Sequence, residues 1–362
     1  MRKIVLVVIL LVMFLRGQAQ NGYIVSGKIQ NVAVHQVSLV SSERGSLDTL
    51  GEAIVNNGSF LIQGCVDGVQ EAQLVFEGVD AVVPFLLENA VFQVMVTPRG
   101  IALQGGGAEQ QLLRKYNQVV QDFAVIQKQI QTEAMKVQGD EIKLKELQMR
   151  ADEAYKKSAE KTMMLIKANA RSYATAYVIA AGIRDETEES LRKKYELLDE
   201  SIHETMPAKK IAVVLERYKK LTDGNMAPNF TVKNPRGDSF ALYDVHCKLK
   251  LLHFWISDNL DCRQINSELV RLYQDYRSRG LEIVSISLDK NVAEWKHAVG
   301  SDGVIWQNGS ELKGWESESV GLYMVKNIPY FVLIDAENRI VAKGIKEAEL
   351  EKNILELLKK RK

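Results

Sequence analysis

The fold of this chain is decided by residues 251–263, whose sequence reads LLHFWISDNLDCR. The apolar run at 251–256 ends in polar residues, and an amphipathic pattern continues through Leu269, Leu272 and Tyr276. An unbroken apolar run is typical of a buried strand, and apolar residues three or four positions apart are typical of a helix that covers it. The stretch therefore predicts a strand, a sharp turn and a helix.

The same stretch resembles the active-site segment of thioredoxin-like thiol–disulfide oxidoreductases, in which F-W-A-S-W-C-x-x-C-R follows a core strand. The matching residues are Phe254, Trp255, Ser257, Cys262 and Arg263. Asn259 stands at the position of the first cysteine.

This one departure decides the expected chemistry. In a C-x-x-C pair the first sulfur attacks as a thiolate stabilised by the helix N-terminus, and the second resolves the mixed disulfide. Asn259 cannot attack, although asparagine is a favourable N-cap. Cys262 keeps the resolving position as a lone cysteine. The candidate catalytic residues are therefore Cys262 and Asn259, the latter in place of the nucleophile.

A second landmark of this family is Pro329, which precedes the apolar residues 330–334. The resemblance implies a cis Ile328–Pro329 bond facing the turn, and a backbone at residue 328 that pairs with an extended substrate. It names Trp255, Ile328 and Pro329 as binding residues. A proline that only starts a strand is the simpler alternative.

Further motifs of this branch follow in order and place a thioredoxin-like domain at residues 223–362. Ala227–Phe230 matches its A-P-D/N-F entry, and Gly237–Val245 resembles its G-x-x-x-x-L-x-D segment. Strands are expected at 249–256, 281–288, 330–334 and 340–342, and helices at 260–279, after Asn291 and at 347–360. Alternating strands and helices predict an α/β sheet.

Residues 22–104 predict a small β domain, a sandwich or a barrel. Its motifs V-S-G-K-I, N-N-G-S-F and F-L-L-E-N resemble those of the β-sandwich-like domain of undefined function that often precedes thioredoxin modules in exported bacterial proteins. Short alternating runs are separated by turn residues, among them the hairpin signal Asn56-Asn57-Gly58. Residues 108–222 predict helices, because apolar residues from Leu112 to Ile130 share one face. The glycines at 105–107 lack the spacing of a phosphate loop and mark a boundary.

The start of the chain predicts export. Arg2 and Lys3 precede an apolar run from Ile4 to Leu15, and Gly17-Gln18-Ala19 offers a cleavage site, so residues 1–19 have the pattern of a signal peptide. No later run is long and apolar enough to span a bilayer. A net charge of +1 implies no bulk attraction to nucleic acid.

Three cysteines give no disulfide framework. The strand at 249–256 separates Cys247 from Cys262 by about 26 Å, whereas a disulfide needs Cα atoms about 4.4–6.8 Å apart. Cys65 belongs to another domain. Asp244, His246 and Cys247 lack a second cluster with which to form a metal site, so no metal and no cofactor are expected.

Other polar residues near the motif have simpler explanations. His253 is expected to be a hydrogen-bonded core histidine, because the thiolate that it could serve is missing. Asp258 and Asp261 are expected to favour the helix dipole rather than to act as acid and base.

Together these features predict a multidomain α+β protein with an N-terminal antiparallel β domain, a helical middle and a C-terminal α/β thioredoxin-like domain. We expect an exported protein of the periplasm or cell envelope that binds a polypeptide or protein thiol partner without dithiol redox activity. Two alternatives stay open. One is an enzyme that acts through Cys262 and an external thiol, and the other is an assembly protein that forms a homodimer through the helical region.

Overall fold

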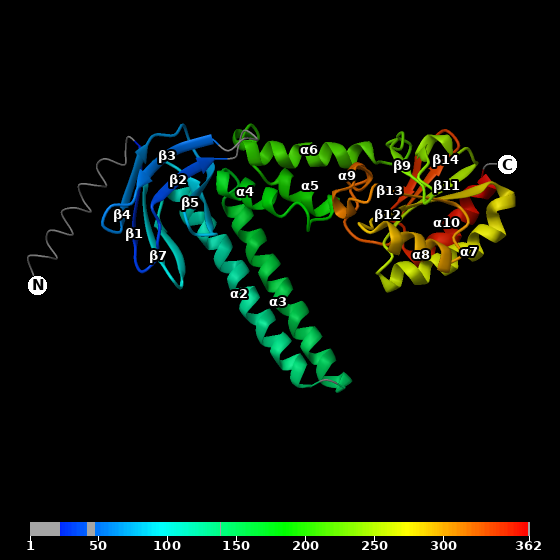
Figure 1. Ribbon diagram of the computed structural model, residues 1–362, viewed down its shortest axis with the longest axis horizontal. Helices are drawn as coiled ribbons and strands as arrows, with labels where there is room; N and C mark the ends of the chain where they lie inside the picture. Colours follow the sequence, from blue (N-terminus) through cyan, green and yellow to red (C-terminus); the bar gives the residue numbers. More distant parts are fainter. Residues whose placement is uncertain (1–21, 42–47, 138, 361–362) are drawn as a thin grey trace, which may run out of the picture. The chain divides into compact units, whose positions relative to one another are not determined.

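The computed structural model describes residues 22–41, 48–137 and 139–360 (Figure 1). The expected signal peptide lies outside the described residues. The chain divides into two compact units, one ending at Ala212 and the other beginning at Val213. Each unit is described by itself, and the predicted domain boundaries stay a prediction.

The first unit opens with two four-stranded sheets, ordered β4-β1-β7-β8 and β3-β2-β5-β6. The strands are β1 (Tyr23–Ile29), β2 (Gln36–Ser41), β3 (Asp48–Ile54), β4 (Ser59–Gly64), β5 (Gln70–Phe76), β6 (Val82–Leu87), β7 (Val91–Thr97) and β8 (Gly100–Gly105). One hydrophobic cluster joins both sheets, and two aromatic pairs, Phe60–Phe76 and Phe85–Phe92, bridge them. The two sheets therefore pack face to face as a sandwich.

One detail corrects the expected antiparallel domain. β1 pairs antiparallel with β4, but it pairs parallel with β7. A parallel pair needs a long crossover connection, and here the chain passes through the second sheet between β4 and β7. The alternation of apolar and polar residues within one strand does not reveal which strand it pairs with or in which direction.

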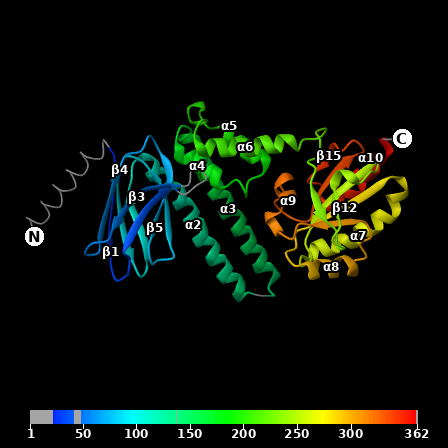
Figure 2. The ribbon, with the colours of Figure 1, turned by 45° about the horizontal axis from the view of Figure 1, so that its top comes forward.

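The helices of the first unit follow directly. They are α2 (Ala108–Lys136), α3 (Glu141–Ala168), α4 (Tyr173–Ala181), α5 (Glu188–Glu196) and α6 (Met206–Lys220), which continues into the second unit. Figures 1 and 2 show α2 and α3 side by side as a hairpin. The side chain of Glu88 accepts the backbone N–H of Gln110 at 3.0 Å, which ties the start of α2 to the end of β6.

The second unit is built on a seven-stranded sheet ordered β10-β9-β13-β12-β11-β14-β15. Its elements are β9 (Thr231–Lys233), β10 (Ser239–Ala241), β11 (Leu249–Trp255), α7 (Leu260–Tyr276), β12 (Leu281–Ser287), α8 (Val292–Ser301), β13 (Gln307–Ser310), α9 (Glu318–Leu322), β14 (Tyr330–Asp335), β15 (Ile340–Lys343) and α10 (Glu347–Lys360). β11, β12 and β13 run parallel, and β14 and β15 close one edge antiparallel.

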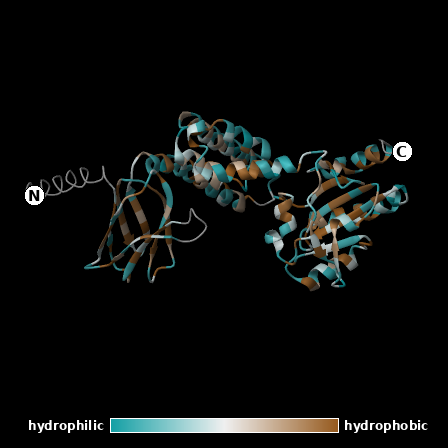
Figure 3. Cartoon of the chain, turned by 90° about the horizontal axis from the view of Figure 1, so that it is seen from above, coloured by the Kyte–Doolittle hydropathy of each residue, from teal (hydrophilic) through white to brown (hydrophobic). Residues whose placement is uncertain are grey.

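Central strand β11 is buried along its whole length, as expected for a strand with both faces covered. One face packs against α7 and α10, and the other packs against α9 and Tyr323. Figure 3 shows the hydrophobic residues in brown along the strands. Lys250 and His253 are the two polar residues of β11, and the Lys250 ammonium donates to Leu242 O at 2.7 Å and to Asn338 Oδ1 at 2.9 Å.

These elements confirm the predicted fold class, and the sequence patterns missed three short strands. β9 and β10 are only three residues each, and β13 reads Gln-Asn-Gly-Ser. β13 is buried although it is polar, so hydrophobic alternation could not reveal it. Among the described residues, no helix has both the length and the apolarity that crossing a membrane requires.

Candidate functional site

The turn after β11 carries Asn259, which begins α7. Its side-chain oxygen accepts the backbone N–H of Cys262 at 2.9 Å, and its backbone is extended. This is the geometry of an N-cap, in which a side-chain acceptor satisfies one of the free N–H groups of the first turn. The predicted cap is confirmed, and residue 259 has a structural role in the first turn.

The thiol of Cys262 is inaccessible. The residue has 0% of its surface exposed and packs in a cluster with Trp255, Trp295 and Ala298. Burial, with a smaller contribution from nearby carboxylates such as Asp261, raises the pKa of the Cys262 thiol to about 11. A thiol in this state is protonated at neutral pH, and the thiolate is the form that attacks disulfides.

A buried carboxylate lies beside this turn. Asp289, 3% exposed, accepts the Ser257 hydroxyl at 2.5 Å and the Ser287 hydroxyl at 2.6 Å. The backbone N–H of Ser257 also points to Asp289, at 3.2 Å from Oδ2. These bonds fix the end of β11 against the end of β12. Asp289 follows the strand expected at 281–288, and no local pattern marked it as part of the site.

Arg263 clamps the other side of the helix start. Its guanidinium donates two bonds to Asp302, from Nε at 2.6 Å and from Nη2 at 2.5 Å, and a third to Ser257 O at 3.3 Å. Asn266 adds a bond to the same carboxylate at 2.8 Å. A bidentate arginine–carboxylate pair is geometrically specific. Asp302 follows Arg263 by 39 positions, and no local pattern marks it.

The predicted binding residues separate into two groups. The Ile328–Pro329 bond is cis, and both residues are half-buried at the start of β14. β14 runs antiparallel to β11 with Tyr330 opposite Phe254, so Pro329 lies at the end of the sheet where α7 begins. Ile328 also packs against the Cys262 cluster.

Trp255 corrects the expectation of a binding surface. It is 0% exposed and its indole packs beneath the turn, because β11 places alternate side chains against the α7 face. The Trp255 side chain packs against Cys262 in the core and is not accessible to a binding partner. The exposed apolar residue of the turn is instead Leu260, at 84%.

His253 is a core histidine. It lies fully buried between Trp255 and Phe331 in stacked geometry, and its Nδ1 is 3.2 Å from Ser285 Oγ. Burial lowers the pKa of His253 to about 3, so the ring is neutral at physiological pH.

The remaining candidates do not converge. All three cysteines are free, and only Cys65 is exposed. Asp244 accepts a local backbone bond from Ala241 at 2.8 Å. Within residues 22–41, 48–137 and 139–360, no three His, Cys, Asp or Glu side chains gather in a way that could hold a metal ion.

Two family models match the chain. The model of the AhpC/TSA family matches residues 224–343, and that of a domain of unknown function, DUF4369, matches residues 23–140. The first match covers most of the seven-stranded sheet, including the Asn259 turn and Pro329. The second covers the sandwich and α2.

Individual curated proteins and solved structures are similar to a part of the chain. The thiol–disulfide oxidoreductase ResA of Bacillus thuringiensis is 29% identical over 133 residues, which is 37% of this chain and 75% of that protein. The solved thioredoxin domain of a thiol–disulfide oxidoreductase from Bacteroides vulgatus is 27% identical, with 38% of this chain and 99% of that chain covered and a TM-score of 0.36. A solved thioredoxin-like protein from the same organism is 30% identical, with 37% and 88% covered and a TM-score of 0.34.

Proposed function

We propose that this chain is a binding protein of the TlpA/ResA-like thiol–disulfide oxidoreductase family, to which it belongs through its C-terminal domain. It is an exported protein of the periplasm or cell envelope that binds polypeptides and has lost the dithiol redox chemistry of its relatives. Export is supported by the signal-like sequence of residues 1–19.

The observation that carries the loss of redox chemistry is the asparagine at position 259. Its amide oxygen caps α7 through the backbone N–H of Cys262, so the turn keeps its shape without an attacking sulfur. Reduction of a disulfide by a dithiol needs one sulfur to attack and a second to resolve. Cys262 alone supplies no more than the second step.

The alternative of a lone-thiol enzyme is not favoured by the surroundings of Cys262. Such an enzyme needs an accessible thiol with a depressed pKa. Here burial shields the sulfur, and the same burial raises the pKa of the thiol to about 11. The helix N-terminus favours a thiolate, but the desolvation of the sulfur and the three nearby carboxylates act in the opposite direction.

Polypeptide binding is supported by what surrounds the capped turn. Leu260 is 84% exposed, and the half-buried Ile328 and Pro329 lie at the same end of the sheet. An extended segment that crosses this edge would cover apolar surface without any need for a reactive sulfur. The site therefore suits a partner with an unfolded or extended apolar segment.

The test is a binding titration with a fluorescently labelled polypeptide that cannot refold, such as reduced and carboxymethylated lactalbumin. We expect saturable binding that Leu260→Arg weakens at least fivefold, because a charge then replaces exposed apolar contact. Ile142→Arg is the matched control, since Ile142 is also an exposed aliphatic residue, at 75%, but lies in α3 of the other unit. No saturable binding, or equal weakening by both variants, would exclude this surface as the binding site.

A further inference from the structure

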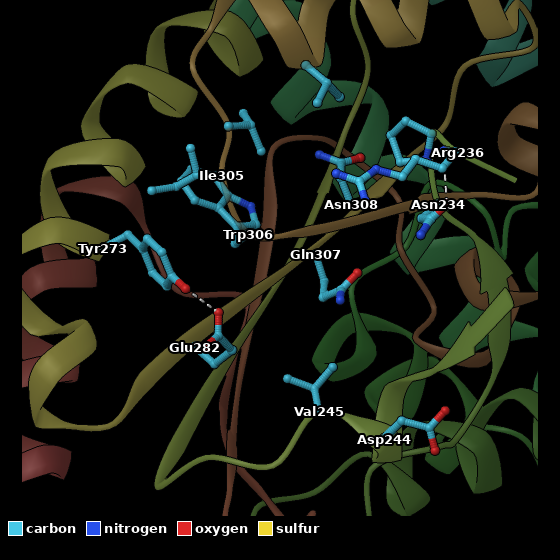
Figure 4. Close-up of a pocket in the computed structure, with 13 residues that line it drawn as sticks. Asn234, Arg236, Asp244, Val245, Tyr273, Glu282, Ile305, Trp306, Gln307 and Asn308 are labelled. Carbon is cyan, nitrogen blue, oxygen red and sulfur yellow. Dashed lines mark hydrogen bonds between the residues drawn. The ribbon is translucent and has the colours of Figure 1, made fainter. Parts of the chain in front are cut away.

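A second candidate site lies in the same unit, away from the capped turn. A cavity of about 710 Å³ lies beside the starts of β12 and β13 and the turn after β9 (Figure 4). Small-molecule sites commonly measure about 300–1,000 Å³. Its lining includes Glu282 near the start of β12, whereas Cys262 and Pro329 lie beyond the opposite end of the parallel strands.

The cavity is lined by a buried amide, that of Asn308, with an unsatisfied hydrogen-bond donor. It lines the cavity and is only 3% exposed. Its Oδ1 accepts the indole N–H of Trp295 at 2.9 Å, which fixes the orientation of the amide. Its Nδ2 is buried and has no acceptor among the described residues. A buried amide N–H₂ without an acceptor is costly, and a ligand oxygen would supply the missing bond.

A cationic side chain lines the same cavity as this amide. β13 and β9 pair only at Ser310 and Lys233, in antiparallel sense. The turn that follows β9 carries Arg236, which lines the cavity together with Asn308 (Figure 4). Arg236 is exposed, lines the same cavity and carries five N–H donors. A buried amide and a guanidinium together form a donor pair for a carboxylate.

The part of the cavity away from Asn308 is lined by acidic side chains. Tyr273 donates its hydroxyl to Glu282 at 2.6 Å, and Asp244 lines the same space. Asn308 on β13 pairs with Ser285 on β12, and Ser285 lies three residues after Glu282. At about 3.3 Å per residue, the positions of Asn308 and Glu282 are about 10 Å apart along the strands. The indole of Trp306 lines the cavity and provides an apolar surface.

We propose that this cavity binds a small organic carboxylate with an apolar body. The carboxylate is held by Asn308 and Arg236, the body packs on Trp306, and an ammonium at the far end is favoured over a second carboxylate because Glu282 and Asp244 lie there. This proposal does not depend on the redox state or the partner of the Cys262 site.

The test uses four probes of equal chain length with the full chain: octanoate, ω-aminooctanoate, octanedioate and octylamine. Binding is followed by NMR through the side-chain amide of Asn308 and the indole N–H of Trp306. The indole of Trp315, which is 50% exposed and does not line the cavity, is the internal control. We expect saturable shifts with octanoate, tighter binding of ω-aminooctanoate, and at least fivefold weaker binding of octanedioate and octylamine.

Two variants separate the carboxylate contacts from folding. Asn308→Asp keeps an acceptor for Trp295 and removes the donor, and Arg236→Gln removes the charge of an exposed side chain. Each is expected to weaken octanoate at least fivefold, whereas Arg99→Gln, an exposed arginine of the other unit, changes nothing. The proposal is overturned if octanoate gives no saturable shift at Asn308 or Trp306, if octylamine binds as tightly as octanoate, or if Arg236→Gln binds octanoate like the wild type.

Discussion

The side-chain oxygen of Asn259 lies 2.9 Å from the backbone nitrogen of Cys262 and accepts its hydrogen bond. The residue that replaces the nucleophile of the family thus holds the helix that carries the remaining cysteine. One substitution removes the attacking sulfur while the start of α7 stays capped.

The cap is expected to contribute measurably to stability. Asn259→Ala removes the acceptor and leaves the Cys262 N–H unsatisfied, which should lower the free energy of unfolding by about 0.5–2 kcal/mol. Asn259→Ser keeps a capping oxygen and is the matched control, with a smaller loss. Urea denaturation of the three proteins measures the difference, and an alanine variant as stable as the wild type would speak against the cap.

Burial predicts the order in which the cysteines react. Cys65 is exposed and Cys262 is fully buried with a raised thiol pKa. Iodoacetamide at pH 8 should therefore modify Cys65 first and should reach Cys262 only after urea unfolds the domain. Peptide mapping by mass spectrometry gives the rates. Modification of native Cys262 as fast as that of Cys65 would show that the thiol is accessible.

His253 is expected to make the protein sensitive to acid. Its pKa is about 3 in the folded chain and about 6.5 when unfolded, so the neutral ring is favoured by folding. This stabilisation is complete above pH 6.5 and is lost as the pH falls toward 3. From pH 7 to pH 5 the loss amounts to about 2 kcal/mol. His253→Phe should remove this part of the pH dependence of unfolding, whereas the exposed control His297→Phe should retain it.

Local signals in the sequence accounted for much of this architecture. Asn259 was readable as an N-cap and Asn291 as the residue before a helix, and the side chains of both cap the helices that follow them. Such signals succeed because each depends on hydrogen bonds within one turn.

Longer-range relationships could not be read in this way. Asn57 and Gly58 have positive φ as the hairpin signal requires, yet β3 and β4 share only the Asn56–Ser59 bridge and enter different sheets. Asp289 and Asp302 join the site through tertiary packing, from 32 and 39 positions away. The resemblance named Trp255 as a binding residue, but Trp255 is fully buried because β11 is covered on both faces.

Rebuilding the missing cysteine tests how far the geometry of the site is retained. Asn259→Cys creates Cys-Leu-Asp-Cys at a helix N-terminus, where the dipole and the amides favour a thiolate. Asp258 and Asp261 oppose this by raising thiol pKa values, as they already do for Cys262. We expect oxidised glutathione to take two hydrogens from the thiols of residues 259 and 262, and mass spectrometry should detect that loss in their peptide. A folded variant that never forms this bond would show that the backbone of the turn has drifted.

The loss of dithiol redox activity is tested most directly by insulin reduction with dithiothreitol as the electron donor. The wild-type protein should not exceed the rate of dithiothreitol alone, Cys262→Ser should behave identically, and Asn259→Cys should accelerate the reaction. Turnover by the wild-type protein that disappears in Cys262→Ser would contradict the account, because it would show that Cys262 is a working nucleophile despite its burial.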